Sequence, residues 1–171
     1  MTADRRRTYI LNMLHRAETP VSASALAAEL SVSRQVIVGD IALLRAAGAP
    51  ISATPRGYVL SEKEKRGERR TVACRHSGGE MEAELCIMVD HGCTVVDVVV
   101  EHPVYGQITA PLELSSRWDV TQFVERVASE EARPLSALTD GVHLHTLICP
   151  DPAAFERTVR QLDEAGFLMK D

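Results

Sequence analysis

Residues 141–148 read Gly-Val-His-Leu-His-Thr-Leu-Ile, a short, apolar and partly β-branched stretch that follows an Asp140-Gly141 turn. This pattern predicts a β-strand. Alternate side chains of a strand share one face, so His143 and His145 point the same way, roughly 7 Å apart along the backbone. Such a pair is either two core or edge histidines with hydrogen-bond partners, or half of a metal site.

The bulk composition indicates a globular protein of one sizeable domain or two small ones, with 171 residues, 45% of them hydrophobic and 25% charged. Asp4 and the arginines after it stand where the apolar core of a secretion signal would begin, and no apolar run approaches ~18 residues. We therefore expect a cytoplasmic protein without a membrane segment. Its four scattered cysteines are expected to be reduced thiols: Cys74, Cys86, Cys93 and Cys149.

Charge is distributed unevenly along the chain. Residues 1–65 carry 9 Lys and Arg against 6 Asp and Glu, whereas residues 66–171 carry 10 against 18. A basic first part followed by an acidic second part indicates an N-terminal module that binds a polyanion and a C-terminal module with another task.

The N-terminal part has the spacing of three helices, at residues 4–17, 23–30 and 34–47. The last two are joined by about three residues, and Ser33 is a suitable N-cap for the third. Two helices joined in this way are typical of a helix-turn-helix, although a plain helical hairpin has the same pattern.

The start of the third helix has side chains that suit a major groove. Arg34 can bind guanine through two hydrogen bonds, Gln35 can bind adenine, and Val38 can touch a thymine methyl group. Ser33 and the helix N-terminus can hold a phosphate. We predict that these residues contact DNA.

Residues 51–60 predict two short strands around a Pro-Arg-Gly turn, which after a helix-turn-helix indicates the wing of a winged helix. Arg56 at the tip is placed to meet a phosphate or a minor groove. Gly39 departs from the usual pattern of a recognition helix. It costs about 1 kcal/mol of helix propensity against Ala and leaves no side chain at a position that often contacts DNA.

Residues 61–70 have no apolar anchor and are expected to form a solvated linker, so the predicted domains are 1–60 and 71–171. The second domain is expected to have the order β-α-β-β-α-β-α. This is an α+β arrangement, an open-faced sandwich of a mostly antiparallel sheet with helices on one face. The expected elements lie at residues 71–76, 80–91, 93–101, 105–114, 120–129, 142–148 and from 151 onward.

A carboxylate and a third histidine extend the His143 and His145 pair. Glu84 lies on or beside an apolar stripe of the helix at 80–91, where an unpaired carboxylate is costly. His76 ends the first strand of the second domain, and the first and last strands of such a sandwich can be neighbours. The four side chains would then form a ligand set for one Zn(II), Ni(II), Fe(II) or Mn(II) ion with room for a further ligand.

The same set could serve a metal-dependent hydrolase fused to a DNA-binding domain. A clear acid/base residue and a nucleophile motif are missing, and Glu101 and His102 are the only candidates near a strand end. Together with the DNA-binding half, this favours a ligand sensor over an enzyme.

The stretches LSVSRQVIVGDIALLRAAG (30–48), EHPVYG (101–106) and LTDGVHLHT (138–146) resemble those of the niacin-responsive transcriptional repressors of the NiaR type, over nearly the whole chain. The resemblance implies an HPr-like C-terminal fold and a homodimeric repressor that binds double-stranded operator DNA. It also implies that genes for NAD synthesis or niacin uptake are regulated, with nicotinic acid as co-repressor. The metal ligands of the family correspond to His76, Glu84, His143 and His145.

We expect the metal ion to stay bound and to form the floor of a pocket for nicotinic acid or a related pyridine, whose ring nitrogen or carboxylate could reach an open coordination position. A cation or hydroxyl would hold one end of the effector, and His102, Tyr105 and Arg117 are the candidates. A repressor that senses the metal itself remains an alternative.

Overall fold

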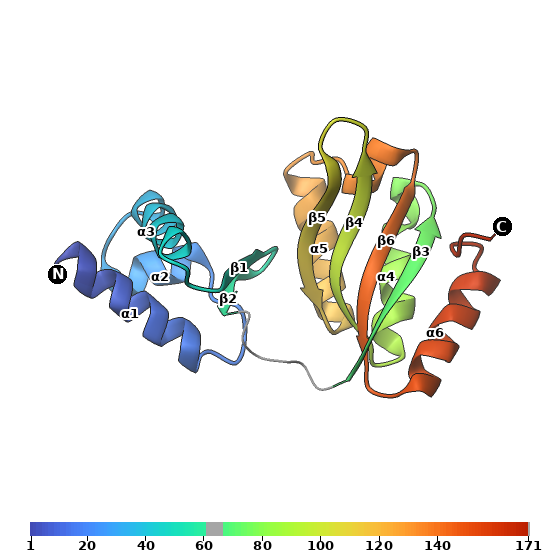
Figure 1. Ribbon diagram of the computed structural model, residues 1–171, viewed down its shortest axis with the longest axis horizontal. Helices are drawn as coiled ribbons and strands as arrows, with labels where there is room; N and C mark the ends of the chain where they lie inside the picture. The colour runs from blue at the N-terminus through green and yellow to red at the C-terminus, as the bar shows by residue number, and fades with distance from the viewer. Residues whose placement is uncertain (61–66, 171) are drawn as a thin grey trace. The chain divides into compact units, whose positions relative to one another are not determined.

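The computed structural model describes residues 1–60 and 67–170, and the chain forms two compact units, Met1–Glu64 and Lys65–Asp171. In the first unit the three expected helices are present to within one residue at each end. They are α1 (Ala3–Arg16), α2 (Ala23–Leu30) and α3 (Arg34–Ala46), and the strands β1 (Ile51–Thr54) and β2 (Gly57–Leu60) follow (Figure 1).

Local capping explains where these helices begin. The hydroxyl of Ser22 accepts a hydrogen bond from the Ala25 amide at 3.0 Å, and that of Ser33 accepts one from the Val36 amide at 3.3 Å. Each satisfies an amide that has no partner within its helix. The apolar faces then pack into one core, which buries Ile10, Leu14, Leu26, Ile37, Ile41, Leu44 and Ile51.

The two strands form the expected wing. β1 and β2 pair antiparallel, and Val21, which precedes α2, bridges to Tyr58 and ties the wing to the helices. Gly57 permits this approach, because a Cβ there would lie 2.5 Å from the Val21 carbonyl carbon. The helix-turn-helix is therefore a winged helix and not a plain helical hairpin.

The second unit has the expected order β-α-β-β-α-β-α. Its elements are β3 (Glu68–Arg75), α4 (Met81–Asp90), β4 (Thr94–His102), β5 (Gly106–Leu114), α5 (Arg117–Ser129), β6 (Val142–Cys149) and α6 (Pro152–Glu164), with short 3-10 turns η1 (Gly78–Glu80) and η2 (Leu135–Thr139). None of the helices in the described parts of the chain is long and apolar enough to cross a membrane.

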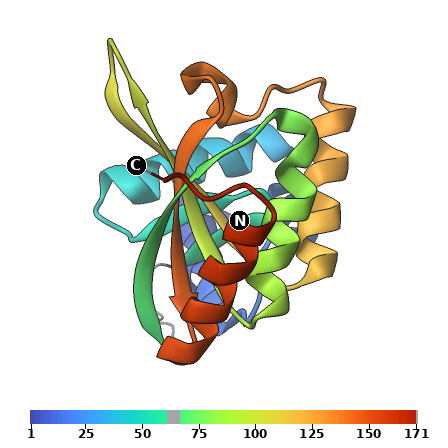
Figure 2. The same cartoon turned by 90° about the vertical axis from the view of Figure 1, so that its right-hand side faces the viewer.

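The four strands form one antiparallel sheet in the order β3-β6-β4-β5, so the first and last strands are neighbours as expected. Helices α4, α5 and α6 cover one face of this sheet (Figure 2). The core lies between them, where Leu85 and Met88 of α4 meet Val95 of β4 and Leu147 of β6. A register shift between Val95 and Asp97 interrupts the pairing of β4 with both of its neighbours.

Two boundaries differ from the sequence-based expectation. Residues 61–66 of the expected linker lie outside the described residues, but Glu68–Arg70 already belong to β3, where they pair with Cys149–Leu147. An edge strand tolerates such charged side chains because one flank of it is open to water. Helix α5 begins at Arg117, three residues before the expected start at residue 120, and is capped by Ser116.

The expectation of four reduced thiols is wrong for two of them, since Cys93 and Cys149 form a disulfide. Thr94 pairs with Ile148, so the two cysteines stand opposite each other on neighbouring antiparallel strands, with Cα atoms 4.2 Å apart. The two cysteines are 56 residues apart in sequence, so their pairing was not predictable from local sequence patterns. Cys74 and Cys86 are free.

Candidate functional site

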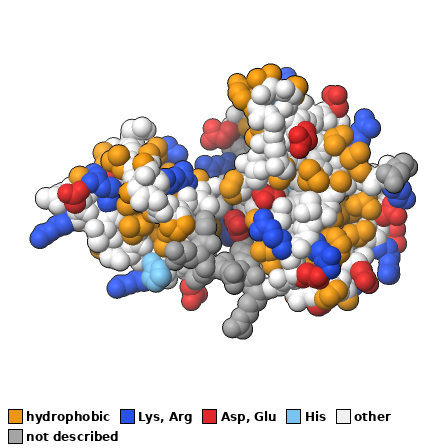
Figure 3. Space-filling model, in the orientation of Figure 1, with side chains coloured by type: hydrophobic (Ala, Val, Ile, Leu, Met, Phe, Trp, Pro, Cys, Tyr) orange, Lys and Arg blue, Asp and Glu red, His pale blue; other side chains and the backbone are white. Residues whose placement is uncertain are grey.

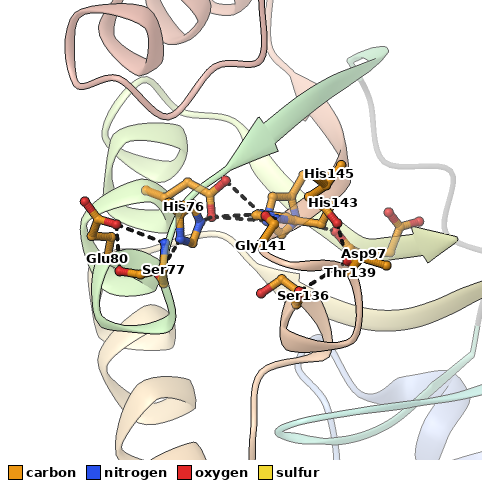
Figure 4. Close-up of polar contacts among 11 residues, drawn as sticks. His76, Ser77, Glu80, Asp97, Ser136, Thr139, Gly141, His143 and His145 are labelled. Carbon is orange, nitrogen blue, oxygen red and sulfur yellow. Dashed lines mark hydrogen bonds and ion pairs between the residues drawn. The ribbon is translucent and has the colours of Figure 1, made fainter. Parts of the chain in front are cut away.

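Three histidines, which Figure 4 labels, converge on the carboxylate of Glu84. The Nε2 atom of His76 lies 2.6 Å from Oε2 of Glu84, that of His143 lies 3.0 Å from Oε1, and that of His145 lies 3.4 Å from Oε2. All four side chains are between 1% and 4% exposed. The structure thus brings together the four residues that the sequence singled out as metal ligands.

Three parts of the second unit position the members of this cluster. His143 and His145 alternate on the helix-covered face of β6, and Cys74 of β3 pairs with His143, which places His76 beside them at the end of β3. Glu84 lies on the first turn of α4, and this helix packs against the sheet and directs the carboxylate toward the histidines. The end of β3 and the start of α4 are close in sequence, and β6, which follows about 60 residues later, completes the cluster.

The Nδ1 atoms of the three rings fix how the rings are turned. Each Nδ1 lies within hydrogen-bond distance of a backbone carbonyl, at 2.6 Å from Ser77, 2.8 Å from Gly141 and 2.7 Å from Asp97. A carbonyl only accepts, so each Nδ1 carries a proton, and a neutral ring then has its lone pair on Nε2. Histidines that bind metals are oriented in this way.

The charge of the cluster also favours a cation. A carboxylate only accepts, so in the absence of an ion each Nε2 needs a second proton to bond with Glu84, and three imidazolium groups would face one carboxylate in a buried site. A divalent ion bound by three neutral rings and the carboxylate has a smaller net charge than three imidazolium groups facing the same carboxylate. The residues therefore fit a divalent metal ion, and the ligand atoms of His76, Glu84 and His143 all lie within 4.8 Å of one another.

Electrostatics keep the carboxylate ionised. Burial raises the pKa of Glu84, but hydrogen bonds from His143, His145 and His76 outweigh it and hold this pKa far below its usual range. Burial lowers the pKa of His76, but Glu84 outweighs it and the net shift is upward. Burial and the Glu84 carboxylate both raise the pKa of the Cys74 thiol, which makes it a poor ligand.

Several residues that support the cluster were missed at the sequence level. The carbonyl that holds His145 belongs to Asp97, at the register shift in β4, and irregular pairing of this kind has no signature in a single sequence. Glu80 accepts hydrogen bonds from the amide and hydroxyl of Ser77 and so fixes the turn after His76. Gly141 packs so closely that a Cβ there would lie 2.3 Å from the His76 carbonyl oxygen.

A cleft of about 440 Å³ opens beside the cluster. Its walls come from the end of β3 with η1, from η2, and from the turn before β6. The lining residues are Arg75, His76, Ser77, Gly78, Pro134, Ser136, Ala137, Asp140 and Gly141.

The three expected effector-binding residues do not line this cleft. Arg117 pairs with Asp90, which lies six residues after Glu84 on α4, or about 9 Å along the helix. His102 lies four residues beyond the Val98 that pairs with His145, or about 13 Å along β4. It accepts hydrogen bonds from the amides of Val104 and Tyr105, and so shapes the tip of the β4–β5 hairpin.

The expected DNA-binding residues lie on α3 and the wing of the first unit. Arg34 and Gln35 are exposed on the first turn of α3, and Val38 is half-buried on the second. Ser33 caps the helix, and Arg56 stands in the turn of the wing. Gly39 is exposed, with no other group within 4 Å of where a Cβ would stand.

Comparison with known proteins agrees with this division of tasks. Residues 6–59 match the HTH domain family and residues 69–171 match the 3H domain family. The HTH match, together with relatives that are transcription repressors, identifies a DNA-binding regulator and not an enzyme.

Two relatives cover nearly the full length of the chain. It is 48% identical over 162 residues to the probable transcription repressor NiaR of Thermotoga maritima, covering 95% of this chain and 92% of that protein. It is 44% identical over 169 residues to the transcription repressor NadR of Bacillus subtilis, covering 97% and 94%. The chain belongs to this NiaR/NadR family of transcription repressors.

The close packing of Gly141 against His76 leads to a first prediction. The substitution Gly141→Ala forces the His76 backbone away and is expected to weaken Zn(II) binding about 10- to 100-fold, measured by isothermal titration calorimetry. Gly166→Ala is the matched control, since Gly166 has a similar φ of +78° against +86° and nothing within 4 Å of a Cβ. An equal loss of Zn(II) affinity in both variants would mean that backbone strain, and not the contact with His76, weakens binding in Gly141→Ala.

The metal-free chain is expected to lose stability as the pH rises. Because folding raises the pKa of His76, the protonated ring stabilises the folded chain. This stabilisation is complete at a pH below the ordinary pKa of 6.5 and is lost as the pH rises through the raised pKa of the folded state. The lowered pKa of Glu84 contributes stability above 4.5, which is lost in acid. In urea with a chelator, the free energy of unfolding should therefore be higher at about pH 5.5 than at about pH 8.5. The difference should shrink in His76→Gln, and an unchanged difference would contradict this origin.

Proposed function

We propose that the chain is a metal-containing repressor of genes for NAD synthesis or niacin uptake, with nicotinic acid as its co-repressor. It acts as a homodimer on double-stranded operator DNA in the cytoplasm. The observation that carries the proposal is the convergence of three correctly oriented imidazoles on a buried carboxylate, in a chain that also has a winged helix.

One divalent ion per chain is bound by His76, Glu84, His143 and His145. Three imidazoles and a carboxylate suit Ni(II), Zn(II), Fe(II) or Mn(II), and a set of this kind does not suit Mg(II) or Ca(II), which prefer oxygen ligands. When bound, the ion supplies the positive charge that the buried carboxylate and the three lone pairs require.

Operator binding uses the exposed start of α3 and the wing. Arg34 and Gln35 contact base edges, Ser33 and Arg56 contact phosphates, and Val38 packs against a base. Helix α3 has no acidic residue in its first turn, which leaves this end positive.

A homodimer suits a winged helix that binds a palindromic operator. The sheet offers a surface for it, because Val142, Leu144 and Ile148 alternate with the buried histidines and so face away from the helices. An antiparallel sheet with one solvated face normally has polar side chains there. Hydrophobic side chains are visible among charged ones on this uncovered face (Figure 3). Sedimentation equilibrium should find twice the chain mass of 18.7 kDa, and a single mass would contradict the dimer.

The function is tested with an operator duplex selected from a random library by the metal-loaded chain. In fluorescence anisotropy, saturating nicotinate should increase operator affinity at least about tenfold, and nicotinamide should not, since a ligand shifts two states by its differential affinity. Arg34→Ala should weaken operator binding by about 1–3 kcal/mol in either condition. Arg160→Ala, an exposed arginine on α6, is the matched control.

Two results would contradict the proposal. Equal operator affinity with and without nicotinate would exclude nicotinate as co-repressor. Release of the operator by a chelator alone, at every nicotinate concentration, would indicate that the metal itself is the signal.

A further inference from the structure

We propose that the cleft beside His76 binds the co-repressor as a planar aromatic carboxylate, that Arg75 holds its carboxylate, and that the ligand does not touch the metal ion. The inference rests on the proposed function for the identity of the ligand. It adds where the ligand binds, which residue selects an acid over an amide, and what the ion does.

The size and walls of the cleft suit a small aromatic ring. Its volume of about 440 Å³ lies in the range of small-molecule pockets. Pro134 and Ala137 supply apolar surface, and Ser136, only 7% exposed, is a buried polar residue of the wall. A few polar groups in a mostly apolar cleft are what orients a small ligand.

Arg75 is the cation of the cleft. It is exposed at the last position of β3, and within residues 1–60 and 67–170 its guanidinium forms no ion pair. A guanidinium binds a carboxylate through two parallel hydrogen bonds, which an amide cannot match. Asp140 is the acid of the cleft and would repel a carboxylate, so the carboxylate of the ligand lies on the Arg75 wall.

Three of the four candidate metal ligands lie outside the wall of the cleft, so an ion that they held would lie behind it. Glu84, His143 and His145 are not among the lining residues, and the side chain of His76 is 3% exposed. Ser77 and Gly141 do line the cleft, and their carbonyls are the ones that orient His76 and His143 (Figure 4). The ligand therefore contacts the backbone that holds the metal ligands, not the ion.

This arrangement makes metal and ligand binding reinforce each other. An ion that orders His76 and His143 also orders Ser77 and Gly141, and the amide of Gly141 in turn donates to the Ser136 carbonyl of η2. All three walls of the cleft are thus connected to the cluster. Linkage requires that nicotinate raise metal affinity by the factor by which metal raises nicotinate affinity.

The test uses the full chain loaded with Co(II), whose visible spectrum reports its ligands. Titration with nicotinate should release binding heat without new absorption bands, because the ligands of the ion do not change. Arg75→Gln should lower nicotinate affinity at least about tenfold and leave Co(II) affinity and nicotinamide affinity unchanged, as expected for loss of one charged bidentate contact. Asp140→Asn is the matched control, since Asn also tolerates the φ of 50° found there, and it should not weaken nicotinate binding.

New absorption bands on adding nicotinate would overturn the inference, because the ligand would then bind the ion. Unchanged nicotinate affinity in Arg75→Gln would overturn the role of Arg75. In both cases wild-type binding of nicotinate leaves the proposed function standing. If the Co(II)-loaded wild type binds no nicotinate, the proposed function and the inference fail together. Retained Co(II) affinity shows that each variant is folded.

Discussion

The buried carboxylate of Glu84 is the group around which the second unit, Lys65–Asp171, is arranged. Its side chain is 1% exposed on a helix that packs against the sheet, and an unpaired carboxylate in such a place costs several kcal/mol. Three imidazoles offset that cost, and their arrangement requires the end of β3, the centre of β6 and the first turn of α4 to meet at one point. The pairing of β3 with β6 and the close contact of Gly141 with His76 provide this meeting point.

The same cluster is connected to the wall of the cleft, as the proposed role in sensing a ligand requires. Two of the carbonyls that orient the histidines belong to Ser77 and Gly141, which also form the wall of the cleft. The third belongs to Asp97, on the other side of β6, so the cluster connects the cleft to the centre of the sheet. The chain belongs to a family of transcription repressors, so the role proposed for the cluster is in regulation and not in catalysis.

Much of this fold was predictable because periodicity and capping are local. Three predicted features depend on residues only a few positions apart: the shared face of His143 and His145, the apolar stripe around Glu84, and the serine caps of α2 and α3. Features that depend on distant segments were not predictable in the same way. The disulfide of Cys93, the carbonyl partners of the histidines and the start of β3 at Glu68 arise from pairing between strands. The partner of Arg117 was not predictable either: its side chain pairs with Asp90, and its role in effector binding stays a prediction.

X-ray absorption spectroscopy of the zinc-loaded chain identifies the atoms around the ion. We expect nitrogen and oxygen neighbours at about 2.0–2.2 Å, with the multiple scattering of about three imidazole rings. Replacing His145 by Ala should remove the signal of one ring. A sulfur neighbour at about 2.3 Å, or a spectrum without imidazole scattering, would contradict the claim that His76, Glu84, His143 and His145 hold the ion.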